Sequence, residues 1–96
     1  MYNVSIRPLA KQDIQEIIDY YDQINPKLSD TFLVDLENRF DQVIENPEGY
    51  QKRLNNIRGV FLKNFPIGVY YKIYDKNVVI ISVLHTSRNP EIWKKR

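Results

Sequence analysis

The sequence predicts an α+β domain: a strand, an antiparallel helical hairpin and a three-stranded antiparallel meander, with the helices packed on one face of the sheet. A stretch with period two opens the chain, two stretches with helical spacing follow, and three short apolar stretches separated by turn signals close it. The 96 residues contain no linker and no internal repeat, so we expect residues 1–96 to form a single domain.

The first half of the chain supplies one strand and two helices. Tyr2–Arg7 alternates apolar and polar residues, as a strand with one buried face does. The first helix is expected over about residues 8–23, and Asn25 and Pro26 then provide the N-cap and first residue of a second helix, which Pro47 ends. Both helices carry apolar stripes that we assign to the core: Ala10, Ile14, Ile17, Ile18 and Tyr21, then Leu28, Phe32, Leu36, Phe40, Val43 and Ile44. The short link between the helices indicates an antiparallel hairpin.

The second half supplies the meander. Strands are expected at Ile57–Lys63, Ile67–Tyr74 and Val78–Leu84, joined by short turns. Gly59 indicates a bulge or a close approach to the backbone. Residues 50–56 are polar and basic, and we expect a loop there.

The last strand leads directly into a polar stretch. Val78–Leu84 is almost uniformly apolar, which indicates a central strand buried on both faces. The chemistry changes at His85–Arg88, and a rigid strand end is a suitable place for a functional site. The alternative is that these polar residues only end the strand. Asn89 and Pro90 then break the chain, and residues 91–95 are expected to form one short helical turn.

Composition excludes several kinds of site. The chain has no cysteine and one histidine, so we expect no disulfide, no metal site and no cofactor. The three glycines are scattered and form no phosphate-binding loop, and no nucleophile-elbow pattern surrounds Ser82 or Ser87. There is no signal-peptide pattern and no apolar run of ~18 residues, so we expect a cytoplasmic protein.

Charge is divided unevenly along the chain. Residues 1–48 contain four basic and ten acidic side chains, a net charge of −6, whereas residues 49–96 contain ten basic and two acidic ones, a net charge of +8. This asymmetry predicts a basic face for an anionic partner. The alternative is that acidic helices and basic strands complement each other within the fold.

The meander and its exit carry most of the candidate site residues. A cationic cleft with aromatic walls, suited to phosphate, RNA or an acidic peptide, is predicted from Arg58, Lys63, His85 and Arg88 with Tyr50 and Trp93. Cleavage of RNA requires a general base, a charge stabiliser and a general acid. His85 is one candidate for proton transfer, and a second is missing from the pattern. The simpler roles are a structural hydrogen bond for His85 and a lid over the core for Trp93.

The order of these pieces resembles the RelE/ParE superfamily of small bacterial toxins from type II toxin–antitoxin pairs. The resemblance covers nearly the whole chain and rests on Ala10-x-x-Asp13-Ile14, Pro47, Ile57-Arg58, Val69-Tyr70-Tyr71 and Val79–Leu84 with His85 and Arg88. The ending Asn89-Pro90-x-x-Trp93 resembles the ParE-like branch.

The resemblance implies a toxin that a cognate antitoxin neutralises. ParE-like members poison DNA gyrase, whereas RelE-like members cut mRNA on the ribosome. Gly68 stands where RelE-like toxins carry an arginine, and Trp93, which has no hydroxyl, stands at their tail tyrosine. We therefore expect a ParE-like gyrase inhibitor without catalytic residues, whose partners contact Arg58, Lys63, His85, Arg88 and Trp93.

Two alternatives stay open. One is a ribosome-dependent mRNA endoribonuclease, for which His85, Arg58 and Arg88 are the catalytic candidates. The other is an inactive member of the superfamily that only binds its antitoxin. In every case, we expect the antitoxin to bring acidic residues to the basic half of the chain.

Overall fold

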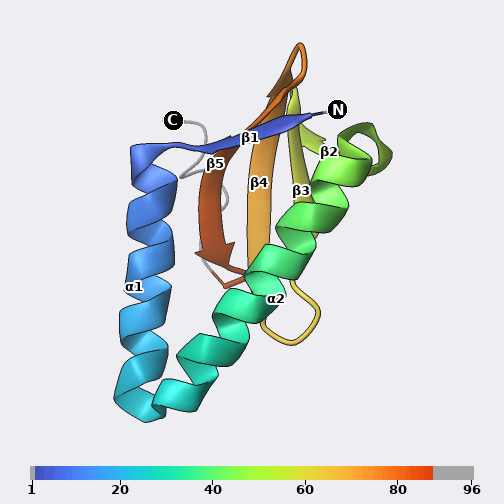
Figure 1. Ribbon diagram of the computed structural model, residues 1–96. Helices are drawn as coiled ribbons and strands as arrows, with labels where there is room; N and C mark the ends of the chain where they lie inside the picture. Colours follow the sequence, from blue (N-terminus) through green and yellow to red (C-terminus); the bar gives the residue numbers. More distant parts are fainter. Residues whose placement is uncertain (1, 88–96) are drawn as a thin grey trace.

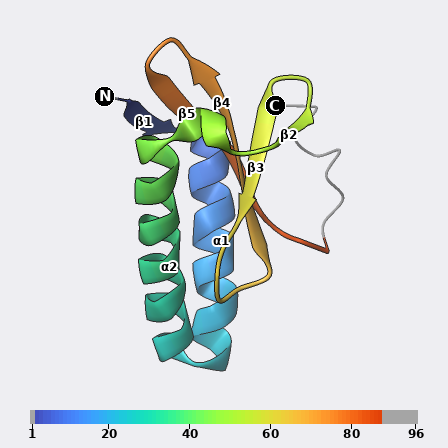
Figure 2. The same ribbon diagram turned by 90° about the vertical axis from the view of Figure 1, so that its right-hand side faces the viewer.

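The computed structural model describes residues 2–87. Its elements are β1 (Asn3–Ile6), α1 (Pro8–Ile24), α2 (Pro26–Glu45), the short 3-10 helix η1 (Pro47–Gly49), β2 (Lys52–Leu54), β3 (Ile57–Phe61), β4 (Ile67–Tyr74) and β5 (Asn77–His85). The two helices form one layer and the sheet forms the other (Figures 1 and 2), which confirms the predicted α+β class. Neither helix combines the length and apolar character that crossing a membrane requires.

The helical hairpin matches its sequence signals. Asn25 is the N-cap of α2, and its side chain accepts a hydrogen bond from the Lys27 N–H at 3.0 Å. Pro8 and Pro26 each occupy the first turn of a helix, where the missing N–H costs no hydrogen bond. The boundaries of both helices lie within about two residues of those predicted from the sequence.

The sheet has five strands in the order β1-β5-β4-β3-β2, with β1 parallel to β5 and all other pairs antiparallel. The predicted loop over residues 50–56 is wrong at Lys52–Leu54, which pairs with β3 as an edge strand. Asn55 has a φ of 51° and forms the turn with Asn56. Asparagine tolerates this left-handed conformation, so the Asn-Asn pair is typical of a hairpin turn. The polar composition of the segment favoured a loop instead.

β5 is buried on both faces, as predicted, and a bulge divides it. Tyr71 pairs with Ile80 and Tyr70 pairs with Ser82, which leaves Ile81 as the extra residue. The bulge changes which residues face the helices: Val78, Ile80 and Val83 join the main core, whereas Ile81 and Leu84 lie in a second cluster with Ile57 and Tyr70.

The main core fills the space between the helices and the sheet. Phe32, Val69, Tyr71 and Ile80 are fully buried there, and the apolar stripe of α1 packs against them. Phe40 is partly buried and packs on the same core, which confirms the predicted phase of α2. The edge strand β1 is less covered than its pattern suggests: Ile6 at its end and Tyr2 just before it pack on the core, but Val4 is 40% exposed.

Replacing Phe32 with alanine tests this core. Phe32 is 0% exposed and contacts the aromatic rings of Tyr21 and Phe65, so Phe32→Ala is expected to lower the free energy of unfolding by about 3–5 kcal/mol. Val34→Ala is the matched control, because Val34 lies on the same helix and is 58% exposed. Urea denaturation of both variants measures the difference. Equal stabilities would show that α2 is rotated relative to the sheet.

Candidate functional site

The structure places the predicted cationic residues at two ends of the sheet. Arg58 pairs with Tyr71 near one end, whereas His85 pairs with Ile67 at the other. Tyr71 and Ile67 are four residue steps apart along β4, about 13 Å at ~3.3 Å per residue. Lys63 follows β3 at the same end as His85. The structure therefore does not bring Arg58 and His85 into one cleft. Arg88, Trp93 and the predicted helical turn at 91–95 lie outside the described residues.

Arg58 holds the connection between α2 and β2. Its Nη1 donates hydrogen bonds to the backbone oxygens of Glu48, at 3.1 Å, and Tyr50, at 2.6 Å. Beside it, the Tyr71 hydroxyl donates to the backbone oxygen of Pro47 at 2.5 Å. Side chains from the neighbouring strands β3 and β4 thus hold the backbone of η1 in place. Burial raises the pKa of Tyr71 to about 12, against a smaller lowering by the Arg58 charge.

His85 is exposed where β5 ends. Its Nδ1 accepts a hydrogen bond from the Ser87 N–H at 3.1 Å and lies 2.8 Å from the Ser87 hydroxyl. Because a backbone N–H points at Nδ1, the neutral ring carries its proton on Nε2. Among residues 2–87, no hydrogen bond joins the ring to another titratable side chain, and no three His, Asp or Glu side chains gather closely enough to hold a metal ion.

A groove of about 400 Å³ lies between α1 and the end of β5. It is lined from α1 by Asp13, Glu16, Ile17, Tyr20 and Tyr21, and from the sheet and its exit by Ile67, Val83, Leu84, His85 and Ser87. The sequence predicts Asp13 on the polar side of the first helix, together with Glu16, Asp19 and Asp22. This is wrong for Asp13, which is buried and whose Oδ2 accepts the Val83 N–H at 3.1 Å. Its helical spacing with Ala10 and Ile17 was the signal that this acid lies on the inner face.

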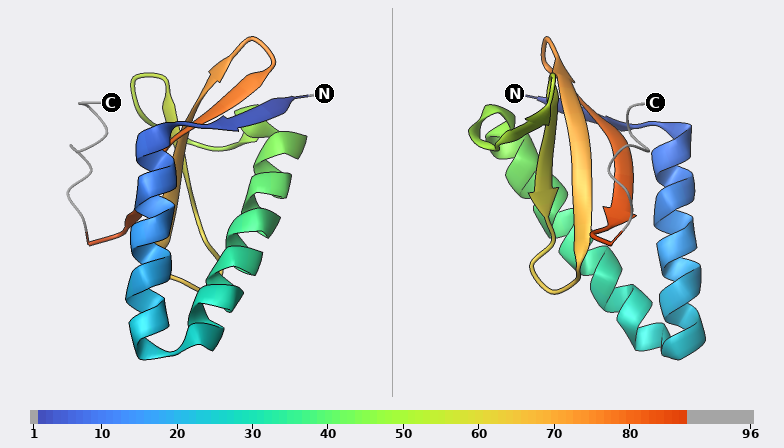
Figure 3. Two further views of the ribbon diagram at one scale, coloured as in Figure 1. Left: turned by 60° about the vertical axis from the view of Figure 1, so that its left-hand side comes forward. Right: turned by 180° about the vertical axis from the view of Figure 1, so that it is seen from behind.

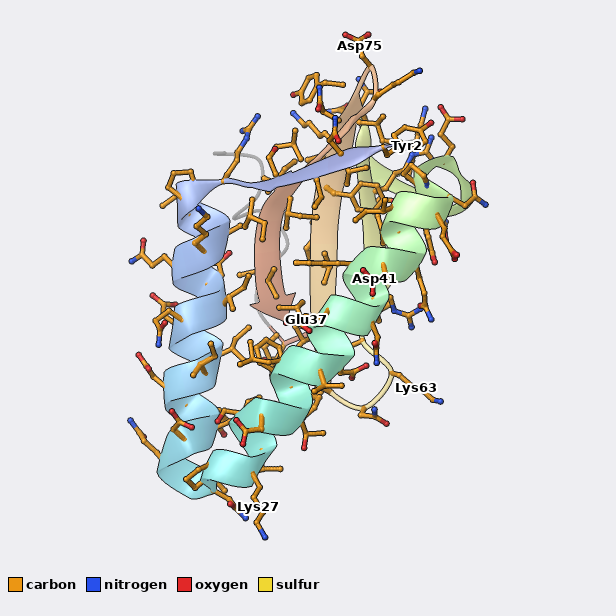
Figure 4. The ribbon with its side chains drawn as sticks, in the orientation of Figure 1. Tyr2, Lys27, Glu37, Asp41, Lys63 and Asp75 are labelled. Carbon is orange, nitrogen blue, oxygen red and sulfur yellow. The ribbon has the colours of Figure 1, made fainter. Side chains whose placement is uncertain are left out.

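Lys63 belongs to a different depression. It lies in the β3–β4 loop beside α2 (Figure 4), where a polar hollow of about 540 Å³ separates the loop from the helix. Asp35 of α2 accepts the backbone N–H of Asn64 at 2.8 Å and so fixes the loop. Lys63 itself is exposed. Lys63 and His85 therefore mark the same end of the sheet but lie beside different helices.

Tyr70 occupies the space above two glycines, Gly59 and Gly68, and belongs to the second core cluster. This cluster lies on the face of the sheet away from the helices, and the right-hand view of Figure 3 presents that face to the viewer. A Cβ atom at Gly68 would lie 2.6 Å from the Tyr70 hydroxyl oxygen, and one at Gly59 would lie 2.9 Å from its ring. The close approach predicted at Gly59 is therefore confirmed. Any side chain at Gly68, an arginine included, would require the Tyr70 ring to move.

The comparisons with known proteins agree with this fold. The family model described as "ParE toxin of type II toxin-antitoxin system, parDE" matches residues 4–90. A solved structure of a chromosomal ParDE toxin–antitoxin system from P. aeruginosa has a TM-score of 0.78 and 16% identity, over 88% of this chain and 96% of that one. No curated protein sequence matches the chain.

Two E. coli structures are also similar. A mutant of the toxin RelE in complex with an antitoxin RelBc peptide has a TM-score of 0.66 and 19% identity, over 98% of this chain and 92% of that one. The intact RelBE toxin–antitoxin complex has a TM-score of 0.63 and 18% identity, over 92% of this chain and 100% of that one. At these identities, the similarity shows the fold alone.

Replacing Arg58 separates a structural role from a binding role. Arg58→Gln removes the charged donor from the backbone oxygens of Glu48 and Tyr50, and is expected to lower the free energy of unfolding by about 1–3 kcal/mol. Lys63→Gln is the control, with an expected change within about 0.5 kcal/mol, because Lys63 is exposed. Urea denaturation measures both. An Arg58→Gln variant as stable as the parent would leave Arg58 available for a partner.

Because the pKa of the Tyr71 hydroxyl is raised, we expect the protein to lose stability at alkaline pH. Its pKa is about 12 in the folded chain and about 10 when unfolded, so the unfolded chain loses this proton first. The free energy of unfolding is therefore expected to fall as the pH rises from about 10 to about 12. Tyr71→Phe removes this contribution, while Tyr21 and Tyr70 remain the same in both proteins. Urea midpoints across this range measure the two slopes, and identical slopes would contradict the assignment.

Proposed function

The chain belongs to the ParE toxins of type II toxin–antitoxin systems, and we propose that it acts in the cytoplasm by binding DNA gyrase, not by cutting RNA. The separation of Arg58 from His85 carries this proposal. A nuclease needs its proton-transfer groups and its charge stabiliser within reach of one phosphate. Here, Arg58 is engaged by the backbone near η1, about 13 Å along the sheet from His85.

Gly68 supports the same choice. The resemblance to RelE-like toxins places an arginine at this position, where this chain has the Tyr70 ring packed onto bare backbone. Tyr70 is 8% exposed, so the ring is part of the second core cluster and leaves no space for an arginine. His85 then has no second proton-transfer group bonded to it among residues 2–87.

We also propose that an antitoxin neutralises the chain at the end of the sheet that carries Lys63 and His85. Both side chains are exposed there, and the chain leads from Ser87 towards Arg88 and Trp93 in the sequence. Acidic residues of the antitoxin would meet the positive charges of Lys63 and Arg88, which speeds association. Arg58 is left out of this surface, because its guanidinium holds the backbone of Glu48 and Tyr50.

The test combines two assays with one variant. We expect the purified chain to inhibit gyrase and to increase gyrase-dependent DNA cleavage, while leaving ribosome-bound mRNA intact. His85→Gln keeps the size of the side chain but removes a proton-transfer group, and it is expected to retain gyrase inhibition within about twofold.

A ribosome-dependent endoribonuclease would show the opposite pattern. It would cut mRNA, and His85→Gln would lower the cleavage rate by about 10²–10⁴. Circular dichroism of the variant controls for folding. A folded chain without activity in either assay would support the inactive, antitoxin-binding alternative and overturn the proposal.

A further inference from the structure

The face of the sheet away from the helices carries a cluster that the fold does not need for its main core. Gly59 pairs with Tyr70, which belongs to the second core cluster, so both lie on this face. Phe61 follows Gly59 by two residues on β3 and therefore lies on the same face. We call this surface the outer face; the right-hand view of Figure 3 presents it to the viewer.

Missing side chains at Gly59 and Gly68 allow a flat cluster to form on the outer face. A Cβ atom at Gly59 would lie 2.9 Å from the Tyr70 ring and 3.0 Å from Cγ of Arg53, so both side chains lie against the bare backbone. The guanidinium carbon of Arg53 lies 5.1 Å from the centre of the Phe61 ring, at a distance typical of a cation–π contact. Arg53, Phe61 and Tyr70 thus form one layer across β2, β3 and β4, which we call the arginine–aromatic plate.

The plate combines a buried base with exposed contact groups. Tyr70 is 8% exposed, whereas Phe61 is 41% exposed and Arg53 is exposed. One exposed phenylalanine is common on protein surfaces, so Phe61 alone would indicate no partner. Here, the stacked guanidinium lies beside it, and a planar guanidinium can stack on a ring while its N–H edge donates to a carboxylate. Because both groups are already held in place, binding through them costs little side-chain entropy.

The charge of the outer face favours an anionic partner. In the part of the chain that the structure describes, the five strands contain no aspartate or glutamate, whereas four of their residues are lysine or arginine. Asp75 lies in the turn at the tip of β4 and β5 (Figure 4), and the other described acids lie on α1, α2 and η1. A carboxylate on a partner would therefore meet Arg53 without repulsion from this face.

The composition of the outer face favours a protein over a nucleic acid. Binding along a phosphate backbone relies on several cations. Arg53 and Lys72 are the two that the described part of this face contains, because Lys52 pairs with Arg58 and lies on the opposite face. In protein interfaces, by contrast, a few arginine and aromatic side chains supply most of the binding energy. The plate therefore fits a protein surface on which a carboxylate lies beside an apolar depression.

We propose that the arginine–aromatic plate is the surface through which this chain contacts gyrase, with Phe61 in an apolar depression and Arg53 paired with a carboxylate of gyrase. This inference rests on the proposed function, because it assigns the surface that performs it. It also gives the two partners different parts of the sheet. The antitoxin meets the end that carries Lys63 and His85, whereas gyrase meets the outer face.

The experiment measures inhibition of DNA supercoiling by purified gyrase, with the full chain as inhibitor. Phe61→Ala and Arg53→Ala are each expected to raise the concentration needed for half-maximal inhibition by at least about tenfold. Tyr74→Ala is the control for Phe61, because Tyr74 is 47% exposed on the same face but six residue steps along β4 from Gly68, about 20 Å at ~3.3 Å per residue. Lys52→Ala is the control for Arg53, because Lys52 is the neighbouring exposed cation on the opposite face.

Both controls are expected to change the half-maximal concentration by less than about twofold. Circular dichroism and urea denaturation of all four variants establish that each is folded. If the parent chain inhibits gyrase and folded Phe61→Ala and Arg53→Ala inhibit it equally well, the plate is not the contact surface, and the proposed function stands without it. If the parent chain binds labelled duplex DNA without gyrase at physiological salt and Arg53→Ala abolishes that binding, the occupant is nucleic acid and the proposal is overturned. If the parent chain does not inhibit gyrase at all, the proposed function and this inference fall together.

Discussion

The hydrogen bond from the Val83 N–H to the Asp13 carboxylate joins the first helix to the last strand across 70 residues of sequence. It lies just beyond the bulge at Ile81, on the side of β5 where the pairing with β1 has already ended. A buried N–H without a partner would cost about 1–3 kcal/mol, so an acceptor is needed there once the neighbouring strand ends. Asp13 supplies it from α1 and at the same time holds the helix alongside the edge of the sheet.

The arrangement of the functional surfaces follows from that contact. With α1 held beside β5, the exposed apolar residues of the helix face the end of the strand and form one groove with it. β4 and β5 carry His85 to the end of the sheet that also displays Lys63, whereas β3 carries Arg58 to the far end and turns it towards η1. The same sheet thus separates Arg58, which holds the backbone near η1, from the two exposed side chains that we propose meet a partner.

Much of the fold could be predicted because its elements have clear periodicity. The two helices, their caps and the doubly buried β5 follow from the spacing of apolar residues and from prolines. β2 was not predicted, because an exposed edge strand does not require alternating apolar residues. The Asn55-Asn56 turn is its one indication in the sequence. The bulge in β5 was not predicted, because a run of aliphatic residues does not show at which residue the strand register shifts.

The candidate site was harder to predict than the fold. Strand order places Arg58 and His85 in one sheet and Lys63 in the loop after β3, but their separation depends on register, which short sequence patterns do not determine. Asp13 and Arg58 have charged side chains that the fold uses for backbone hydrogen bonds, and composition gives no sign of this. Gly68 was identified as a departure from the RelE-like pattern, and the structure adds the physical reason, since Tyr70 lies against it.

The central claim is that this toxin acts without cutting RNA, and cells that express it provide the most direct test. The 5′ ends of all mRNAs, sequenced before and shortly after induction, should remain unchanged while breaks in DNA accumulate at gyrase sites. New mRNA 5′ ends in phase with the reading frame, appearing before any effect on DNA, would contradict the account and support a ribosome-dependent endoribonuclease.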